Sequence, residues 1–483
     1  MKEIRRAILC LFMVLVLAAM AVCGNSLFKL QQNEQKTHEQ TITAEEKERW
    51  AAPDEEVLDY YGLGEFTTTL PVIYINTEGQ QILKENKIRG NIALLDENGE
   101  EQSILSTPNH LYSATIKYRG ASSYGNFDKK QYRIKFCKKN SDKAKNVSLA
   151  GMSEHSEWVL NGPYLDKTLM RNKLMYDLAR ELTGWAPDSR FVELFVDGNY
   201  QGVYLAVEPV TNGENRLNLT EFSLLSGKTG YIVKRDRVGT EETEIETYGK
   251  LAGYTNNALY LEYPSSKDAT LRQIEYVEED VSAFERALYG DNFADPETGY
   301  NAYINVDNWV DYFIINEFAM NYDAGNLSTY AYKDIEGKLN LAVWDFNNGF
   351  DNYQWFRTEM DEFQTVENSW FNRLAQDRNF IDKVVARYRE LRKSTLSEEH
   401  IFRQLAKYEE ELGDAVDRNF KVWGYSFKEN LLIGKKPDGT SRDIRSYEEA
   451  VKQLKTTIRK RIAFMDEHID EELYEDRVDG KEQ

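Results

Sequence analysis

The sequence predicts an α+β fold in which a β-rich N-terminal part precedes a mainly helical C-terminal part. Short β-branched and aromatic runs, separated by turn residues, occupy the chain from about residue 66 to residue 236. Segments with apolar residues at helical spacing dominate from residue 367 to residue 472. Hydrophobic residues make up 41% of the 483 positions, which is enough for a packed core. This order of elements favours two lobes with a cleft between them.

The first 24 residues predict an export segment. Basic residues at positions 2, 5 and 6 precede an apolar run from Ala7 to Cys23. The run is intermediate in length between the core of a signal peptide and a membrane span. An A-x-A cleavage signal at 19–21 and the cysteine at position 23 leave three alternatives, namely a cleaved signal, an uncleaved anchor and a lipoprotein. The protein is exported in each case, and we expect membrane contact only through this segment.

A polar linker and a β-rich lobe are predicted next. Residues 25–60 lack apolar periodicity and are typical of a tether. Residues 66–245 carry the runs TTLPVIYINT, GNIALLD, LYSATIKYRG and KQYRIKF, which predict an antiparallel sheet of hairpins. A helix is expected between an N-cap at Asp166 and Gly184. A hairpin turning at Asp197-Gly198 and a strand, GYIVKRD, follow.

Residues 246–475 predict a mainly helical lobe. RQIEYVEEDVSAFERALYG reads as an amphipathic helix and VDNWVDYFIINEFAM as a buried one. A hairpin turning at Glu336-Gly337 is inserted after the second helix. The remaining helices are interrupted once, by the loop GKKPDGTSRD.

Charge and composition exclude several classes of function. The formal net charge of −21 disfavours nucleic-acid binding, because the chain would repel phosphate backbones, and it favours basic partners. Only Cys137 lies outside the export segment, so no internal disulfide is expected. The five histidines are scattered without ligand spacing, which disfavours zinc. Any metal should therefore be a hard ion held by carboxylate oxygens.

Two aspartates frame the inserted hairpin. Asp323 follows the buried helix, Asn326 lies in the next loop, and Asp345 ends an apolar strand. A hairpin returns the chain, so both carboxylates can face one cleft. Phosphoryl transfer uses such a pair, one carboxylate orienting the acceptor hydroxyl and the other holding magnesium. The alternative is that these residues only form turns and cap a strand.

A loop of small residues precedes a basic strand in YRGASSYGNFDKKQYRIKF. Backbone N–H groups and hydroxyls at Gly120, Ser122, Ser123 and Gly125 can wrap phosphate oxygens. The basic residues after the loop alternate in sequence, so some of them should point into the cleft. The alternative is an ordinary hairpin loop beside a solvated basic strand.

These segments together resemble the CotH kinase family over roughly residues 66–355. The resemblance is carried by RGASSYG…KKQYRIKF, by LDKTLMRNKLMYDLARELTGWAPDSRFVELFVDGNYQGVYLAVEPV, by YIVKRD, and by NYDAGNLSTYAYKD…LAVWDFNNGFDN. It implies an atypical two-lobed protein-kinase-like fold that uses ATP with Mg²⁺ or Mn²⁺. It also implies phosphorylation of Ser or Thr in secreted, surface or spore-coat proteins.

The resemblance also implies roles for the acidic segment. Asp323 would be the catalytic acid, and Asp345 would bind the metal with Asn326 as a second ligand. Family members often have W-D-x-D, where this chain has Asn347 in the second acidic place. That difference removes one candidate metal contact.

Lys130, after the small-residue loop containing Ser122 and Ser123, is the predicted ATP-phosphate lysine, with Lys234 as the alternative. A cation there neutralises charge that develops on the phosphates. The carboxylate that pairs with it is expected to be Glu208 or Glu181. Arg171 either reaches the nucleotide or anchors its helix through a salt bridge.

Three classes of function follow from the sequence. The first is a secreted protein kinase whose substrate is a basic, Ser/Thr-rich protein. The second is an inactive adhesin or coat-assembly scaffold on the same fold. The third is a hydrolase that pairs Asp323 with Asp345, which leaves the small-residue loop and the lysines without a task. All three are placed outside the cell or at its surface.

Overall fold

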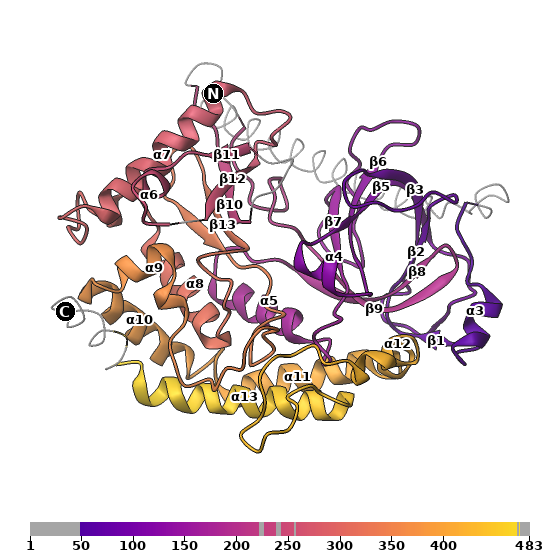
Figure 1. Cartoon of the computed structure of the whole chain (residues 1–483). Helices are drawn as coiled ribbons and strands as arrows, with labels where there is room; N and C mark the ends of the chain where they lie inside the picture. Colours follow the sequence, from indigo (N-terminus) through magenta and orange to yellow (C-terminus); the bar gives the residue numbers. More distant parts are fainter. Residues whose placement is uncertain (1–48, 222–226, 238–242, 256, 471–472, 474–483) are drawn as a thin grey trace, which may run out of the picture.

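The first long strands of the chain close into a barrel. The computed structural model describes residues 49–221, 227–237, 243–255, 257–470 and 473, and in this part seven strands form the ring β2-β3-β5-β6-β7-β9-β8 (Figure 1). Neighbouring strands are antiparallel except β2 and β8, whose parallel pairing closes the ring. The strands are β2 (Val72–Asn76), β3 (Ile88–Leu95), β5 (His110–Arg119), β6 (Gln131–Cys137), β7 (Glu157–Asn161), β8 (Ser189–Val196) and β9 (Asn199–Val207).

The alternation of side chains explains the barrel interior. Residues two apart along a strand, such as Ile73 and Ile75 or Val192 and Leu194, are fully buried in one apolar cluster inside the ring. The predicted β8–β9 hairpin is confirmed. Its two turn residues, Asp197 and Gly198, have φ angles of +48° and +78°, as a two-residue hairpin turn requires.

A second sheet lies beside the barrel. It contains five antiparallel strands in the order β11-β12-β10-β13-β14. They are β10 (Tyr231–Asp236), β11 (Thr243–Ile245), β12 (Ala258–Tyr263), β13 (Thr329–Lys333) and β14 (Asn340–Ala342), and the last two form the predicted inserted hairpin. Because β10 and β11 both belong to this sheet, where each pairs with β12, the lobe boundary predicted after residue 245 does not separate the two sheets. Strand pairing breaks earlier, between Val207 and Tyr231.

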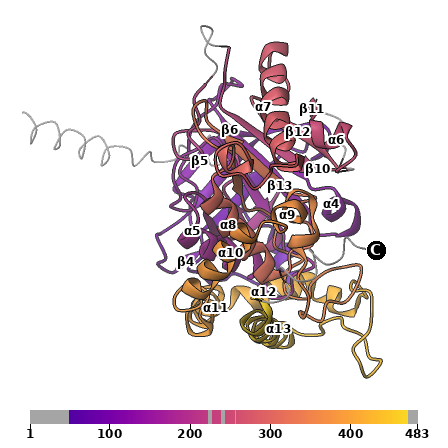
Figure 2. The same cartoon turned by 90° about the vertical axis from the view of Figure 1, so that its left-hand side faces the viewer.

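Helices surround the second sheet and run beneath the barrel. Figures 1 and 2 both show α11, α12 and α13 along the side opposite α7. The longer helices are α5 (Arg171–Leu182), α7 (Leu271–Tyr289), α8 (Val306–Ala319), α10 (Arg378–Leu391), α11 (Glu398–Leu412), α12 (Ala415–Trp423) and α13 (Tyr447–His468). The shorter elements are α3 (Glu55–Tyr60), α4 (Ser122–Asn126), α6 (Tyr248–Leu251), α9 (Ser369–Leu374), the strands β1 (Thr67–Thr68) and β4 (Gln102–Ser103), and the 3₁₀ turns η1 (Tyr300–Ala302), η2 (Thr365–Glu367) and η3 (Gly424–Lys428).

Helix α8 is buried among the second sheet and the helices around it, as its sequence predicted. Its Glu317 and the Arg461 guanidinium of α13 form a fully buried ion pair of 2.8 Å. Glu317 also accepts the backbone N–H groups of Gln364 and Thr365. A buried pair is stable only when such additional hydrogen bonds satisfy it. The contacts fix the C-terminal end of α8, from which the loop with Asp323 departs.

Two local predictions need correction. Residues 49–60, predicted as the end of the tether, fold against the barrel, because Leu58 of α3 is buried and Asp54 caps the helix through the Glu56 and Val57 N–H groups. Asp166 is not the N-cap of α5, since that position is Met170. The Asp166 carboxylate instead accepts the Arg171 N–H at 2.8 Å and pairs with the Arg171 guanidinium.

The fold is therefore a mixed α+β structure, as predicted. Within the described ranges, no helix is both long and apolar enough to cross a membrane. The predicted export segment, residues 1–24, and the linker up to residue 48 lie outside those ranges.

Candidate active site

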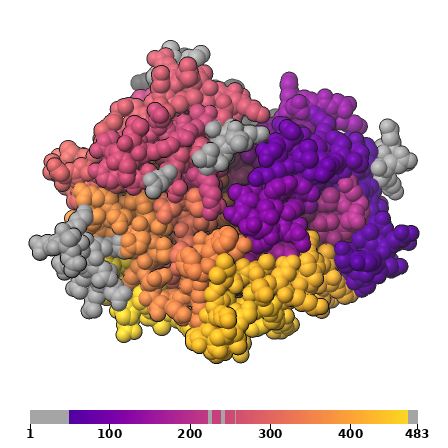
Figure 3. Space-filling model, viewed as in Figure 1, coloured from indigo at the N-terminus to yellow at the C-terminus, as the bar shows by residue number. Residues whose placement is uncertain are grey.

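A cleft of about 940 Å³ lies between the barrel and the second sheet. Strands β5 and β6 form its barrel wall, and β10, β12 and β13 contribute to the other wall. Figure 3 shows the two surfaces meeting, with the barrel in indigo to purple and the second sheet and its helices in pink to orange. The loops that contain Asp323 and Asp345 both border this space. The hairpin β13–β14 thus brings the two predicted aspartates to one cleft.

Asp323 reaches the cleft because α8 ends abruptly. Met320 adopts a left-handed conformation with φ +47° and turns the chain out of the helix. The Asp323 carboxylate accepts a hydrogen bond of 3.2 Å from the Asn348 side chain. Burial, and next the charge of Asp345, raise the pKa of Asp323 to about 6. A carboxylate with this pKa is mainly ionised at neutral pH and can still accept a proton.

Asp345 lies in a constrained segment that follows the end of β14 at Ala342. Its φ of +59° lies in the left-handed region, which Asp tolerates better than most residues. The Asp345 N–H donates to the Tyr176 hydroxyl at 3.2 Å, and the Phe346 N–H donates to Asn172 Oδ1 at 2.7 Å. Burial raises the pKa of Asp345, and the charge of Arg119 opposes that effect. Helix α5 therefore holds the turn that presents this carboxylate.

Strand β10 places a lysine and an acid in the cleft. Lys234 Nζ lies 2.9 Å from Glu262 Oε1 of β12 and 3.8 Å from Asp236 Oδ2. The charge of Asp236 contributes to the raised pKa of both Asp323 and Asp345. Asp236 was not among the residues predicted from the sequence, although its separation of two residues from Lys234 on a strand places both side chains on one face.

The barrel wall of the cleft is basic. Lys117 and Arg119 of β5 and Arg133 and Lys135 of β6 all border the cleft, and Lys117 lies directly opposite Arg133 in the strand register. Like charges at opposed positions destabilise a sheet unless an anion or acid compensates them. Glu157 supplies part of that compensation, at 2.6 Å from Arg133 and 2.8 Å from Lys135. The alternation of basic residues in KKQYRIKF predicted this face.

The small-residue loop borders the cleft as predicted. Ser122 and Ser123 begin the short helix α4, and both line the cleft. Gly120 has φ +92°, and a Cβ there would lie only 2.1 Å from Ser123 Oγ, so the turn requires glycine. The Ser122 hydroxyl accepts a hydrogen bond of 3.1 Å from Arg237, which follows β10. The loop thus bridges the barrel to the second sheet.

Two residues predicted to bind the nucleotide lie elsewhere. Lys130 precedes β6 and donates to the carbonyl oxygens of Tyr124 and Phe127, both at 2.7 Å, which closes its own loop. Glu208 is buried in an ion pair of 2.8 Å with Arg216. Neither lines the cleft. Lys234, the alternative in the sequence analysis, replaces Lys130 as the candidate phosphate lysine. Its carboxylate partner is Glu262, and the other predicted partner, Glu181, contacts His400 on α11.

Arg171 and Asn326 also point away from the cleft. Arg171 is buried, where it pairs with Asp166 at 2.6 Å and donates to the Gly349 carbonyl at 3.0 Å. The helix-anchoring alternative therefore describes it, and the nucleotide-contact alternative does not. The Asn326 Nδ2 donates to the Asn368 side chain at 2.7 Å, and Asn326 does not line the cleft, so the structure does not place this predicted metal ligand beside Asp345.

Asn347, which follows the Asp345 turn, fits a divalent ion better. Among the described residues its Oδ1 is a buried oxygen without a hydrogen-bond partner, and Asn347 lines the cleft with Asp345. A carboxylate and an amide oxygen are ligands that Mg²⁺ and Mn²⁺ accept. No group of three or more His, Cys, Asp and Glu residues in the described part converges closely enough to hold a metal by itself. A bound ion would therefore complete its shell with phosphate or water oxygens, as Mg²⁺ commonly does.

Comparisons with known proteins identify the family of this chain. The model of the family described as "CotH kinase protein" matches residues 116–465. The curated "Inner spore coat protein H" of Bacillus subtilis (strain 168) is 27% identical over 243 residues, which are 48% of this chain and 57% of that protein. The chain thus spans little more than half of that relative's length.

One solved structure has a distant likeness to this chain. The HipA–HipB–operator DNA complex of the Shewanella oneidensis MR-1 toxin–antitoxin system aligns with 82% of this chain and 68% of its own chain. The alignment has 13% identity and a TM-score of 0.26. The family match covers most of the chain, including both cleft aspartates, and the chain therefore belongs to the CotH kinase protein family.

Proposed function

We propose that the chain transfers the γ-phosphate of ATP to Ser or Thr hydroxyls of secreted or surface proteins. One observation carries the proposal. In a CotH-family chain, Asp323 and Asp345 border the same cleft and face a wall of basic barrel residues. Phosphoryl transfer depends on this combination of positioned carboxylates and cations, because catalysis consists mainly of alignment and charge stabilisation.

Each part of the cleft has a task in this reaction. Arg119, Arg133 and Lys234 neutralise the phosphate oxygens of ATP, and Asp345 with Asn347 would hold Mg²⁺ or Mn²⁺. The ion, when bound, supplies positive charge to the phosphates. The acceptor oxygen bonds to the γ-phosphorus while the bond to the bridging oxygen of ADP breaks. The proton of the hydroxyl passes to Asp323, whose pKa of about 6 suits an acceptor near neutral pH.

The name of the curated relative supports a surface location. Inner spore coat protein H is a coat protein by its name, and the export segment predicted at residues 1–24 agrees with substrates outside the cytoplasm. The net charge of −21 favours a basic substrate protein. A Ser/Thr-rich basic protein therefore remains the proposed partner.

The test incubates the full chain with ATP, Mg²⁺ or Mn²⁺ and a basic Ser-rich peptide, and measures transfer by mass spectrometry. Asp345→Ala should lose both divalent-dependent ATP binding and transfer. Asp323→Ala should still bind nucleotide, while transfer falls by roughly two to four powers of ten. Asp307→Ala, an exposed aspartate at the start of α8, is the matched control and should behave as the parent.

Two outcomes would contradict the proposal. A folded Asp345→Ala protein that phosphorylates at the parental rate would refute the site. A parent chain that shows neither transfer nor divalent-dependent thermal stabilisation by ATP would refute the activity, and would leave the inactive scaffold as the function.

A further inference from the structure

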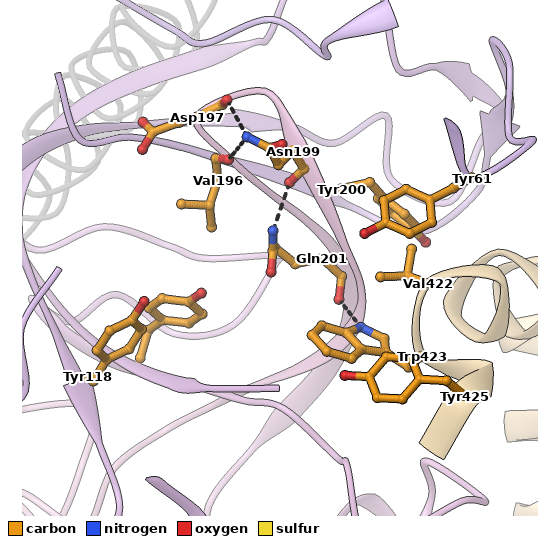
Figure 4. A pocket seen from close by; sticks show the side chains of 11 residues that line it. Tyr61, Tyr118, Val196, Asp197, Asn199, Tyr200, Gln201, Val422, Trp423 and Tyr425 are labelled. Carbon is orange, nitrogen blue, oxygen red and sulfur yellow. Dashed lines mark hydrogen bonds between the residues drawn. The ribbon is translucent and has the colours of Figure 1, made fainter. Parts of the chain in front are cut away.

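A second pocket lies beyond the cleft, and Tyr118 of β5 lines both cavities. It has a volume of about 410 Å³, within the range of roughly 300–1,000 Å³ that is usual for small-molecule sites. Figure 4 shows Tyr118 on one side, the β8–β9 turn above, and Tyr61, Trp423 and Tyr425 on the other side. Neither Asp323 nor Asp345 lines it, and the proposed phosphoryl transfer does not use it.

The walls of this pocket are held in place by contacts between distant segments. The Trp423 indole N–H donates to the Gln201 carbonyl at 2.8 Å, and the Tyr425 hydroxyl donates to Asp128 at 2.8 Å. Gly202, with φ +81°, packs so tightly on α12 that a Cβ would lie 2.4 Å from Asn419 Oδ1. The barrel and the end of α12 therefore form a preformed cavity.

The lining of the pocket is mainly aromatic and includes one carboxylate. Six of its eleven residues are aromatic, namely Tyr61, Tyr118, Tyr132, Tyr200, Trp423 and Tyr425. The side-chain amides of Asn199 and Gln201 also line the pocket (Figure 4). Their NH2 groups donate to carbonyl oxygens of the turn, so these side chains offer a ligand mainly their amide oxygens. Among the described residues that line the pocket, Asp197 is the one ionisable group besides the phenols, and its two oxygens already accept the Thr77 N–H and hydroxyl, both at 2.7 Å. None of these lining residues is a cation, so they offer no charged partner to a phosphate or a nucleotide.

We propose that this pocket binds a neutral saccharide of one or two rings. Trp423 and Tyr425 lie side by side with ring centroids 6.2 Å apart, and Tyr425 is 45% exposed. Ring faces of this kind pack against the C–H faces of a sugar, while phenol and amide groups bond to its hydroxyls. A lysine or quaternary ammonium group also contacts aromatic faces, most strongly where the cation is desolvated. A desolvated cation in turn needs a carboxylate to compensate its charge. Here the Asp197 carboxylate is occupied.

The test titrates the full chain calorimetrically with cellobiose, maltose and N,N′-diacetylchitobiose, and separately with tetramethylammonium chloride. At least one disaccharide should bind with a Kd of about 1 mM or below. Tyr425→Ala and Gln201→Ala should each weaken that binding about ten-fold, which corresponds to about 1.4 kcal/mol. Near-UV circular dichroism verifies the fold of both variants.

Two controls separate this pocket from other surfaces. Tyr254→Ala removes a tyrosine of similar exposure, 49%, that stacks on Tyr289 away from the pocket, and it should leave the Kd unchanged. Asp345→Ala alters the cleft and should also leave it unchanged. Absence of binding by all three disaccharides at about 10 mM would overturn the proposal. Undiminished binding in both pocket variants, loss of binding in Asp345→Ala, or binding of tetramethylammonium alone would overturn it as well.

Discussion

Lys130 and Lys234 differ in what their ammonium groups contact, and this difference separates a structural lysine from a catalytic candidate. Lys130 donates to two carbonyl oxygens of its own loop. Lys234 faces carboxylates inside the cleft, where its side chain is 12% exposed. A cation bonded only to local carbonyls has its charge committed to the loop. One that borders a cleft beside acids can exchange a carboxylate for a phosphate.

Substituting each lysine by alanine should therefore give opposite results. Lys234→Ala should slow transfer by roughly 10- to 100-fold and raise the ATP concentration required, because a cation near the phosphates is lost. The melting temperature of the Lys234→Ala variant should change little. Lys130→Ala should cost about 1–3 kcal/mol of folding free energy, since two partly buried carbonyl oxygens lose their charged donor. ATP titrations and thermal unfolding of both variants measure the two effects, and the reverse pattern would restore Lys130 as the phosphate lysine.

Residue patterns predicted some of this site and missed the rest for physical reasons. Asp323 and Asp345 could be placed together because the intervening hairpin returns the chain. Asn326 could not be assigned, because a loop amide turns toward whichever partner lies nearest, here Asn368. Asp236 was missed because its charge acts on Asp323 and Asp345, and these carboxylates approach it only in the folded chain.

At the scale of elements, α5 is the support of the metal-side turn. Asn172 and Arg171 lie in its first turn, and they hold the Phe346 N–H and the Gly349 carbonyl. The left-handed Asp345 lies between these fixed points and β14. A helix that packs in the core thus sets the position of the Asp345 carboxylate, which is far from that helix in the sequence.

Removing the Asn172 acceptor should affect activity more than stability. Asn172→Ala leaves the Phe346 N–H unsatisfied, which costs about 1–3 kcal/mol, and it frees the turn that presents Asp345. Asn308→Ala is the matched control, because Asn308 is similarly buried and accepts the Leu341 N–H at 2.7 Å. We expect similar losses of melting temperature, with kcat reduced only in Asn172→Ala. Equal kcat values for the two variants would mean that Asn172 has no positioning role.

The β6–β7 pair predicts a pH-dependent contribution to stability. Burial alone would raise the pKa of Glu157, but the charges of Arg133 and Lys135 outweigh burial and lower it from 4.5 to about 2. The folded state therefore holds the proton less tightly than the unfolded state does. The stabilisation is complete above about pH 4.5 and is lost as the pH falls toward 2.

Glu157→Gln should accordingly destabilise the fold by about 1–3 kcal/mol at pH 7, after allowance for solvent screening of the two half-exposed cations. The difference from the parent should shrink steadily below about pH 4.5. Urea unfolding at a series of pH values between 7 and 3 measures it. A difference that stays constant over that series would show that Glu157 contributes through packing and not through its charge.

On the scale of the whole molecule, local patterns predicted the elements better than their closure. The hairpins and helices follow from turns and periodicity within short windows. The barrel depends on the parallel pairing of Val72 with Glu193, which are far apart in the sequence. No local pattern identifies such a partner. The same limit explains why the lobe boundary was predicted too far along the sequence. In composition β10 resembles the barrel strands before it, but it pairs with β12 and β13, which come after it.

The net charge of the molecule gives a last prediction, about substrate preference. A formal charge of −21 creates a negative field that attracts basic segments and repels acidic ones. The basic wall of the cleft is committed to the phosphates in the proposed reaction, so the field acts on the protein substrate. Peptides with one Ser acceptor flanked by Lys and Arg should be phosphorylated with higher kcat/KM than the same peptide flanked by Asp and Glu.

Ionic strength separates this field effect from specific contacts. Exposed charges are screened beyond about 10 Å at 0.1 M salt, so the preference for the basic peptide should decline as salt rises from 0.01 to about 0.5 M. A neutral peptide with the same acceptor is the control, and its kcat/KM should vary much less over that range. Initial rates at fixed, saturating ATP give all three values. Equal use of basic and acidic peptides at every salt concentration would mean that the acidity serves solubility and does not select the substrate.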